Sequence, residues 1–205
     1  MDRIITVEGE GTYEAAPDSV RFECLLSGRR DTQKEAVEAA ADSAVPLRKA
    51  LMDAGFQADA LKTVSVSARP YYENVRDGDA VNTVFAGFEY DHRLRFDADC
   101  DNATVGKVMD AMVSADVQFS MSYRLSDTSD AMRLARDDAV RDATLKAEQL
   151  AKAADVRLGK IMSITYGQSE GAPAFRTMSL RSGAPDMVPE NITFSDRVTV
   201  CWSLL

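Results

Sequence analysis

The segment from residue 128 to residue 154 constrains the fold more than any other part of this sequence. Apolar residues recur in it at spacings of three and four, which predicts one long amphipathic helix. Opposite charges four residues apart predict that its other face meets solvent. The apolar stripe is mostly alanine, so the helix can lie close against a β-sheet. The stripe consists of Met132, Ala135, Ala139, Ala143, Ala147, Leu150 and Ala154.

A sheet to receive this helix is predicted by segments that alternate apolar and polar residues. The longest runs from residue 84 to 96, and residues 20–27, 117–125 and 192–205 alternate in the same way. Such strict alternation favours an antiparallel sheet with one face in water. The inward set of the longest strand is Ala86, Phe88, Tyr90, His92, Leu94 and Phe96.

Local signals place the remaining elements. Residues 4–11 and 20–28, separated by Pro17 and Asp18, predict a β-hairpin. A capping box of Thr32 and Glu35 begins a helix that ends at Gly55.

One further signal interrupts this first helix, and another lies later in the chain. Pro46 predicts a kink or a break within the helix, because its nitrogen has no hydrogen to donate. The polar stretch 73–82, with Asp77-Gly78-Asp79, predicts a turn.

Together these elements predict an α+β fold in one domain covering residues 1–205. We expect one antiparallel sheet with three helices packed on one face and the order β-β-α-β-β-α-β-α-β-β. Within it, residues 21–67 and 85–125 form two strand–helix–strand repeats. Residues 168–191 hold three prolines and two glycines without periodicity, which predicts a flexible loop.

Composition narrows the class of protein. The 33 acidic and 24 basic side chains give a net charge of −9, and the basic residues are interspersed with acids. This argues against nucleic acid as a partner, because nucleic-acid binding needs a clustered cationic face. No apolar run approaches the roughly 20 residues of a membrane span. We expect a cytoplasmic protein if the chain is full length, and a periplasmic or cell-envelope protein if a signal peptide was removed.

The residues that most often carry chemistry do not form a recognisable site. His92 has an inward register, which predicts a structural histidine. The stretch 97–102 resembles the start of a calcium loop, but Asn102 and Val108 stand where glycine and glutamate are required, so its acids are interpreted as a helix N-terminus.

Cysteine spacing and short motifs give no stronger signal. The three cysteines show no close spacing, and only Cys100 lies near a predicted helix start, a setting typical of reactive thiols. Gly9 and Gly11 precede a strand and are assigned to strand geometry, not to a phosphate loop. We therefore predict no catalytic, cofactor-binding or metal-binding residues and no enzymatic activity.

Several motifs resemble the SIMPL-domain family, whose bacterial members include periplasmic immunogenic proteins and oxidative-stress-defence proteins. The resemblance covers nearly the whole chain. It rests on residues 5–11 with Ala16-Pro17-Asp18, on residues 85–88, and on residues 135–151 with 158–161. The chain departs from the family pattern at Asp155, where a helix-ending glycine is usual, at Pro46, and in lacking a secretion signal. The resemblance implies an α+β fold and, for some members, large homo-oligomers; it supplies no catalytic residues.

Three hypotheses follow. The first is a non-enzymatic homo-oligomeric protein that uses apolar residues of the 168–191 loop such as Phe175, Met178 and Leu180, with a stress-related role implied by the resemblance. The alternative is a monomeric adaptor or ligand-binding module whose exposed sheet face, with Arg93, Arg95 and Arg124, holds an acidic protein or peptide partner. The third is a thiol-based antioxidant role for Cys100.

Overall fold

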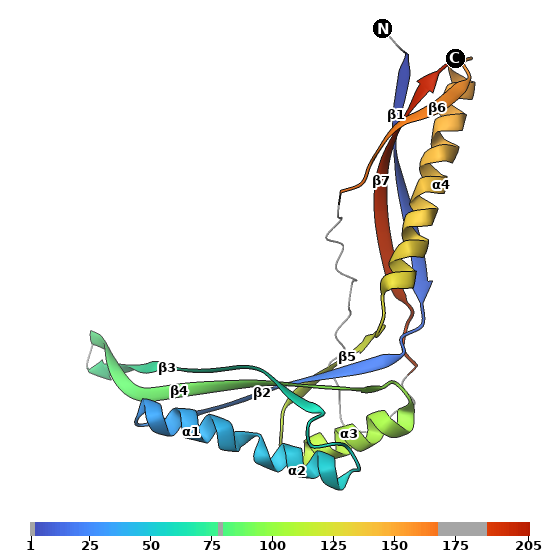
Figure 1. Cartoon of the computed structure of the whole chain (residues 1–205). Coiled ribbons are helices and arrows are strands. Elements are labelled where there is room, and N and C mark those ends of the chain that lie inside the picture. The colour runs from blue at the N-terminus through green and yellow to red at the C-terminus, as the bar shows by residue number, and fades with distance from the viewer. Residues whose placement is uncertain (1–2, 78–79, 168–187) are drawn as a thin grey trace. The chain divides into compact units, whose positions relative to one another are not determined.

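The computed structural model describes residues 3–77, 80–167 and 188–205, with the side chains of residues 77 and 80 left out (Figure 1). The chain divides into two compact units. The terminal unit has described residues 3–18, 124–167 and 188–205, and the central unit has described residues 19–77 and 80–123. Each unit contains its own sheet and its own buried core.

The terminal unit consists of a three-stranded antiparallel sheet and one long helix. Its strands are β1 (Ile4–Ala15), β6 (Leu158–Thr165) and β7 (Ile192–Leu204), in the order β1-β7-β6. Strands β1 and β7 pair without interruption along their length. Helix α4 (Ser129–Ala153) contacts mainly β1 and β7. The first and last strands of the chain are therefore direct neighbours in one sheet.

The buried face of α4 is a row of alanines spaced by four residues. All are at most 3% exposed, whereas Leu150, which the sequence placed on this stripe, is 52% exposed. Met132 is only partly buried and Ala154 is exposed, so the predicted stripe was partly wrong. The row is Ala131, Ala135, Ala139, Ala143, Ala147 and Ala151.

Two glycines of β1 bring α4 into backbone contact with the sheet. A Cβ atom added at Gly9 would lie 2.1 Å from the carbonyl oxygen of Ala139, and one added at Gly11 would lie 2.1 Å from that of Ala135. Any side chain at either position would overlap the helix backbone. Gly9 and Gly11 therefore serve strand geometry, as predicted, and they also set the distance between helix and sheet.

The central unit consists of a four-stranded antiparallel sheet with three helices. The strands lie in the order β3-β4-β2-β5, and the helices cover one face (Figure 1). The buried core forms between that face and the helices and includes Val20, Phe22, Leu47, Leu94, Phe96, Val108 and Met112. In chain order the elements are β2 (Ser19–Arg30), α1 (Gln33–Ser43), α2 (Val45–Asp53), β3 (Leu61–Asp77), β4 (Ala80–Asp99), α3 (Asn102–Ser114) and β5 (Phe119–Arg124).

Local signals in the central unit are confirmed. Thr32 and Glu35 form the predicted capping box at the start of α1. The first predicted helix is broken into α1 and α2, and Pro46 occupies the first turn of α2. Proline fits there because backbone N–H groups of the first turn have no acceptor within the helix. Inward residues of β4 are buried from Tyr90 to Phe96, but Ala86 is exposed.

The α+β class is confirmed, but the predicted single sheet and opening hairpin are wrong. Strand β1 pairs with β7, whereas β2 pairs with β4. At the junction the backbone N–H of Asp18 donates to the carbonyl of Arg124, and its carboxylate accepts from the N–H and hydroxyl of Ser126. The predicted third helix, α4, accordingly packs on a different sheet from the first two.

The chain reverses within residues 73–82, as predicted, but most of this segment is strand and not turn. Strands β3 and β4 remain paired from Tyr72↔Phe85 to Asp77↔Ala80, so this stretch is a two-stranded ribbon. Gly87, with φ of 107°, and a register shift between Pro70 and Tyr72 mark its base. Polar residues are the majority only within residues 73–82. We call residues 70–87 the arm.

Three helices end in the same way, with one residue in the left-handed conformation. These residues are Gly55, Asp116 and Asp155, with φ of 97°, 54° and 53°. In each case the next N–H donates to the carbonyl five residues earlier: Phe56 to Leu51, Val117 to Met112 and Val156 to Ala151. This is the Schellman arrangement, in which glycine is favoured. Asp155 therefore adopts the conformation of the glycine that it replaces in the family pattern.

We predict that Gly11→Ala strongly destabilises the terminal unit. The added methyl group would meet backbone atoms of Ala135 and Ala139 at 2.1 and 2.2 Å, so α4 must move away. Overpacking of this kind costs about 1–3 kcal/mol, and we expect the upper end because backbone cannot rotate aside. Urea unfolding followed by the fluorescence of Trp202, the single tryptophan and a buried residue of β7, measures the change.

Gly167→Ala is the matched control, because an added Cβ there would meet nothing within 4 Å. We expect its unfolding free energy to differ little from that of the wild type. Equal stabilities of the Gly11→Ala and Gly167→Ala proteins would contradict the backbone contact.

We predict that Asp155→Gly stabilises the same unit. A left-handed conformation costs an L-residue roughly 1–2 kcal/mol, which glycine avoids, although glycine also gains entropy in the unfolded chain. A net increase of about 0.5–1 kcal/mol in the unfolding free energy is expected. The same Trp202 assay measures it, and a decrease would show that the Asp155 side chain makes a stabilising contact.

Candidate functional site

The structure places the three predicted arginines on different strands. Arg93 and Arg95 lie two residues apart on β4, with their side chains on the face opposite the helices. Arg124 ends β5, and β2 lies between β5 and β4. The sheet face therefore brings Arg93 and Arg95 together, but it does not place Arg124 beside them.

Charges on this face are largely paired. Asp97 accepts a hydrogen bond from Arg21 at 2.6 Å. The Asp97 carboxylate also lies 3.3 Å from Nε of Arg95, which is close enough for an ion pair, although this Nε makes no hydrogen bond. Arg69 pairs with Glu89 and Asp91 at 2.8 and 2.9 Å. Within the described residues Arg93 makes no ion pair, and its side chain is exposed. Arg93 is thus the cation on β4 that is open to a ligand.

Arg93 borders a hollow of about 320 Å³ on the outer face of the sheet. Leu25 of β2 and Val64 of β3, respectively 48% and 58% exposed, supply an apolar wall. Glu23 and Ser120 complete its polar lining. One guanidinium beside apolar side chains fits a carboxylate that carries an apolar group.

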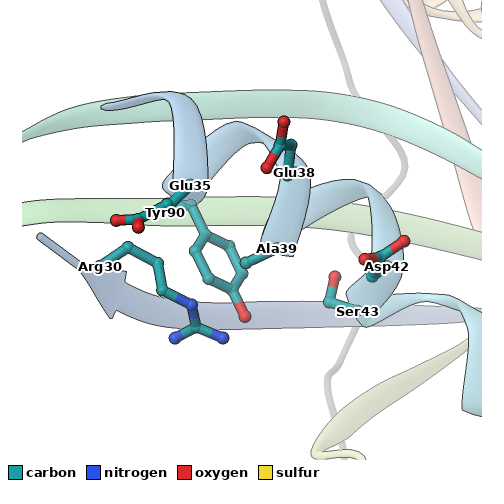
Figure 2. Close-up of a pocket in the computed structure, with 7 residues that line it drawn as sticks. All are labelled: Arg30, Glu35, Glu38, Ala39, Asp42, Ser43 and Tyr90. Carbon is teal, nitrogen blue, oxygen red and sulfur yellow. The ribbon is translucent and has the colours of Figure 1, made fainter. Parts of the chain in front are cut away.

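A larger groove, of about 500 Å³, runs along α1 (Figure 2). Figure 2 shows the Tyr90 ring between Arg30 on one side and the helix on the other. Two of its three acids have partners on the same helix or at its cap: Glu35 accepts from Thr32, and Glu38 lies 3.8 Å from Lys34. This groove is better explained as the solvated side of α1 than as a binding site.

His92 is a structural residue, as predicted. Its side chain is buried, Nδ1 lies 2.8 Å from the carbonyl oxygen of Ala40, and Nε2 lies 3.0 Å from Oγ1 of Thr63. Both ring nitrogens are therefore occupied by neighbours from α1 and β3. The histidine links these two elements across the core.

The cysteines are free thiols. Cys24 is buried against the sulfur of Met112 at 3.5 Å, and burial, followed by the nearby Glu23 carboxylate, raises the pKa of its thiol to about 11. Cys100 and Cys201 are partly exposed. A thiolate is therefore disfavoured at Cys24, and the redox role suggested for Cys100 remains a prediction.

The acidic stretch 97–102 caps a helix, as predicted. The Asp101 carboxylate accepts from the Thr104 N–H at 2.9 Å at the start of α3. The Thr104 side chain, and then this N–H bond, hold the pKa of Asp101 below its ordinary value. Over residues 3–77, 80–167 and 188–205, no three acids, histidines or cysteines gather as metal ligands would.

The free edge of β1 is closed by side chains of α4. The N–H of Glu10 donates to Asp142 at 2.8 Å, and the N–H of Thr12 donates to Asp138 at 3.1 Å. Lys146 pairs with Asp142 at 2.6 Å and also donates to the Glu8 carbonyl at 3.4 Å. The Lys146 ammonium and then the Glu10 N–H hold the pKa of Asp142 below its ordinary value. No edge donor at Glu10 or Thr12 is left for another strand.

A buried carboxylate lies within the core of the terminal unit. The side chain of Asp196, on the inward register of β7, is fully buried and lies 3.2 Å from Nε of Arg136. Tyr166 donates to the same carboxylate at 3.1 Å and accepts from Arg136 at 2.6 Å. These three residues tie α4, β7 and the end of β6 together.

The arm carries the most exposed apolar surface of the central unit. Five of its apolar side chains are between 49% and 58% exposed, and they lie on both faces of the ribbon. Tyr72 and Phe85 stack edge to face with centroids 5.8 Å apart, and Phe85 continues this contact to Phe88. The five are Tyr72, Val75, Val81, Val84 and Phe85.

Sequence reasoning did not find the arm or the β1 edge contacts. Asp77-Gly78-Asp79, a typical hairpin signal flanked by Val75 and Val81, could have indicated a longer ribbon. The predicted interaction residues Phe175, Met178 and Leu180 lie outside the described residues, as does most of the predicted flexible loop at 168–191.

Comparison with known proteins identifies the family. The profile of the SIMPL family, described as a protein of unknown function (DUF541), matches residues 5–202, and the chain belongs to this family. It is 28% identical over 191 residues to the 26 kDa periplasmic immunogenic protein of Brucella melitensis biotype 1 (strain 16M), covering 89% of this chain and 75% of that protein. The protein of the same name from Brucella abortus (strain S19) matches with the same identity and coverage.

No helix of the described residues is both long enough and apolar enough to cross a lipid bilayer. The longest, α4, has charged residues along its exposed side.

We predict that the Cys24 thiol resists alkylation in the folded protein at pH 8. Its pKa of about 11 keeps it protonated, and burial excludes the reagent. Because the folded pKa lies above the unfolded value, the stability from the buried thiol is present below pH 9 and is lost as the pH rises towards 11.

Mass spectrometry after iodoacetamide treatment, with and without urea, measures this. Cys201 is the internal control because it is partly exposed. Equal modification of Cys24 and Cys201 in native protein would contradict the prediction.

Proposed function

We propose that this SIMPL-domain protein is non-enzymatic and works as a homo-oligomer, with the arm at residues 70–87 as a contact surface. The observation that carries the proposal is the exposure of five large apolar side chains on a ribbon that no helix among the described residues covers. A two-stranded ribbon in water is marginally stable by itself, and contact with another chain would stabilise it. Contiguous apolar surface of this kind is typical of protein interfaces.

The arm is also held in a fixed direction at its base, which favours a specific contact. Arg29 lies 3.5 Å from the centroid of the Tyr71 ring and pairs with Glu73 at 3.0 Å. The Phe85–Phe88 contact joins the arm to the buried cluster of Ala36, Ala40 and Tyr90. A ribbon anchored in this way loses less conformational freedom on binding than a free loop.

The family resemblance favours self-association over binding to a different protein. The resemblance implies large homo-oligomers for some SIMPL members, and both faces of the arm need cover, which neighbouring copies in a closed assembly can supply. A periplasmic location is proposed from the relatives, whose names describe periplasmic immunogenic proteins. A stress-related role stays a prediction of the resemblance alone.

A second candidate function is supported by the hollow beside Arg93. Here the protein would be a monomeric adaptor or ligand-binding module that holds an acidic peptide or an apolar carboxylate on its sheet face. Unpaired Arg93 next to Leu25 and Val64 is the observation that favours it. The two functions predict different oligomeric states for the protein without a ligand, because only the first requires association between copies of the chain.

We predict that the wild-type protein sediments as an oligomer at tens of micromolar, and that Phe85→Ser combined with Val84→Ser shifts it to monomer. The substitutions remove apolar side chains from both faces of the arm and leave the buried core untouched. Sedimentation velocity measures the change.

The matched control is Leu145→Gln, which removes an apolar side chain of similar exposure, 55%, from α4. It should leave the oligomer intact. A wild-type protein that is strictly monomeric would contradict the assembly and favour the second function. An oligomer unchanged by the arm variant would show that the contact surface lies outside the arm.

A further inference from the structure

The two edges of the terminal sheet differ in their protection. On β1, the carboxylates of Asp138 and Asp142 occupy the edge N–H groups of Thr12 and Glu10. Strand β6 lies at the other edge, and among the described residues no strand pairs with its outer side. Unpaired strand edges accept further strands unless they are blocked. The open edge of this sheet is therefore β6.

Helix α4 leaves β6 uncovered. A helix is about 10 Å across and strands lie about 4.8 Å apart, so one helix covers two strands. Asp138 and Asp142 hold α4 over β1, which places its contacts on β1 and β7. Ile161 and Ile164 of β6 are consequently 52% and 54% exposed. Their partners on β7, Trp202 and Val200, are 3% and 1% exposed.

The two faces of β6 have different chemistry. Ile161 and Ile164 share the face of the buried β7 residues, where they form an apolar strip beside α4. Ser163 and Thr165 pair with Cys201 and Thr199 on the opposite face. A strand added to this edge would therefore meet Ile161 and Ile164 on one face and Ser163 and Thr165 on the other, with the exposed Met162 at the register shift between Ile161 and Ser163.

The charge around β6 is opposite to that of the whole chain. Residues 157–166 contain Arg157 and Lys160 and no acid, whereas the protein carries a net charge of −9. Both cations are exposed. A second copy of β6 would bring its own two cations to this edge without an acid to pair with them. An acidic strand is the complementary partner.

We propose that the outer edge of β6 binds an extended segment of a partner protein by strand addition, and that this segment alternates apolar and acidic residues. Its apolar residues extend the surface of Ile161 and Ile164, and its acids face Lys160. Main-chain hydrogen bonds supply affinity and the alternating side chains supply specificity. Pairing of β6 with β7 is irregular between Leu158 and Ser163, so addition is expected to begin at the regular stretch from Ser163 to Thr165.

The probe is a fluorescein-labelled seven-residue peptide that alternates valine and glutamate, titrated by fluorescence anisotropy. We expect saturable binding. Methylation of alternate backbone nitrogens should weaken it at least tenfold, because strand addition needs those N–H groups. Replacement of glutamate by lysine should weaken it by a similar factor.

The protein variants are Lys160→Glu and, as matched control, Lys152→Glu in the last turn of α4. Lys160→Glu should weaken binding at least fivefold, and Lys152→Glu less than twofold. Trp202 fluorescence confirms that both variants fold. The arm variant described above should bind the peptide normally, so this proposal and the assembly can fail separately.

Three results would overturn the proposal. The first is the absence of saturable binding at millimolar peptide. The second is equal binding of the N-methylated peptide or equal effects of the two lysine variants. The third is an oligomer that Ile164→Lys dissociates while the arm variant does not, which would assign this edge to a second copy of the chain.

Discussion

The approach of α4 to β1 at Gly9 and Gly11 is the contact on which the terminal unit depends. Four helical residues rise about 6 Å, and two strand residues rise about 6.7 Å, so the two elements stay in step over several turns. The same match allows Asp138 and Asp142, four residues apart, to reach the N–H groups of Thr12 and Glu10, two residues apart. Glycine, alanine and aspartate thus act together to fix one helix on one edge of a sheet.

Both proposed interaction surfaces have a common physical origin, because each lies where a helix fails to cover a strand. In the terminal unit α4 reaches β1 and β7 and leaves Ile161 and Ile164 of β6 exposed. In the central unit α1 begins at Gln33, and the ribbon beyond it keeps Tyr72 and Phe85 in solvent. Strand alternation sets the direction in which these apolar side chains point. They are exposed because no helix of the described residues packs on them.

The sequence predicted local structure better than strand pairing. Capping at Thr32, the break at Pro46 and the burial of His92 depend on nearby residues, and all are confirmed. The pairing of β1 with β7 joins residues nearly the whole chain apart, and no local signal distinguishes it from a hairpin.

Side-chain roles in the site were harder to predict for a similar reason. The charge spacing of α4 predicted its solvent-facing side, where Asp142 pairs with Lys146, but the bond from the Glu10 N–H to Asp142 depends on packing across two elements. The order of strands also has a consequence for biosynthesis. The described central unit is one run of chain, residues 19–123, inserted between the two halves of the terminal unit. Its sheet can form from that run of chain alone, whereas β1 must wait for β7, which follows it by nearly the whole described sequence. Until then β1 is an unpaired strand, and a factor that binds it would act on the nascent chain alone.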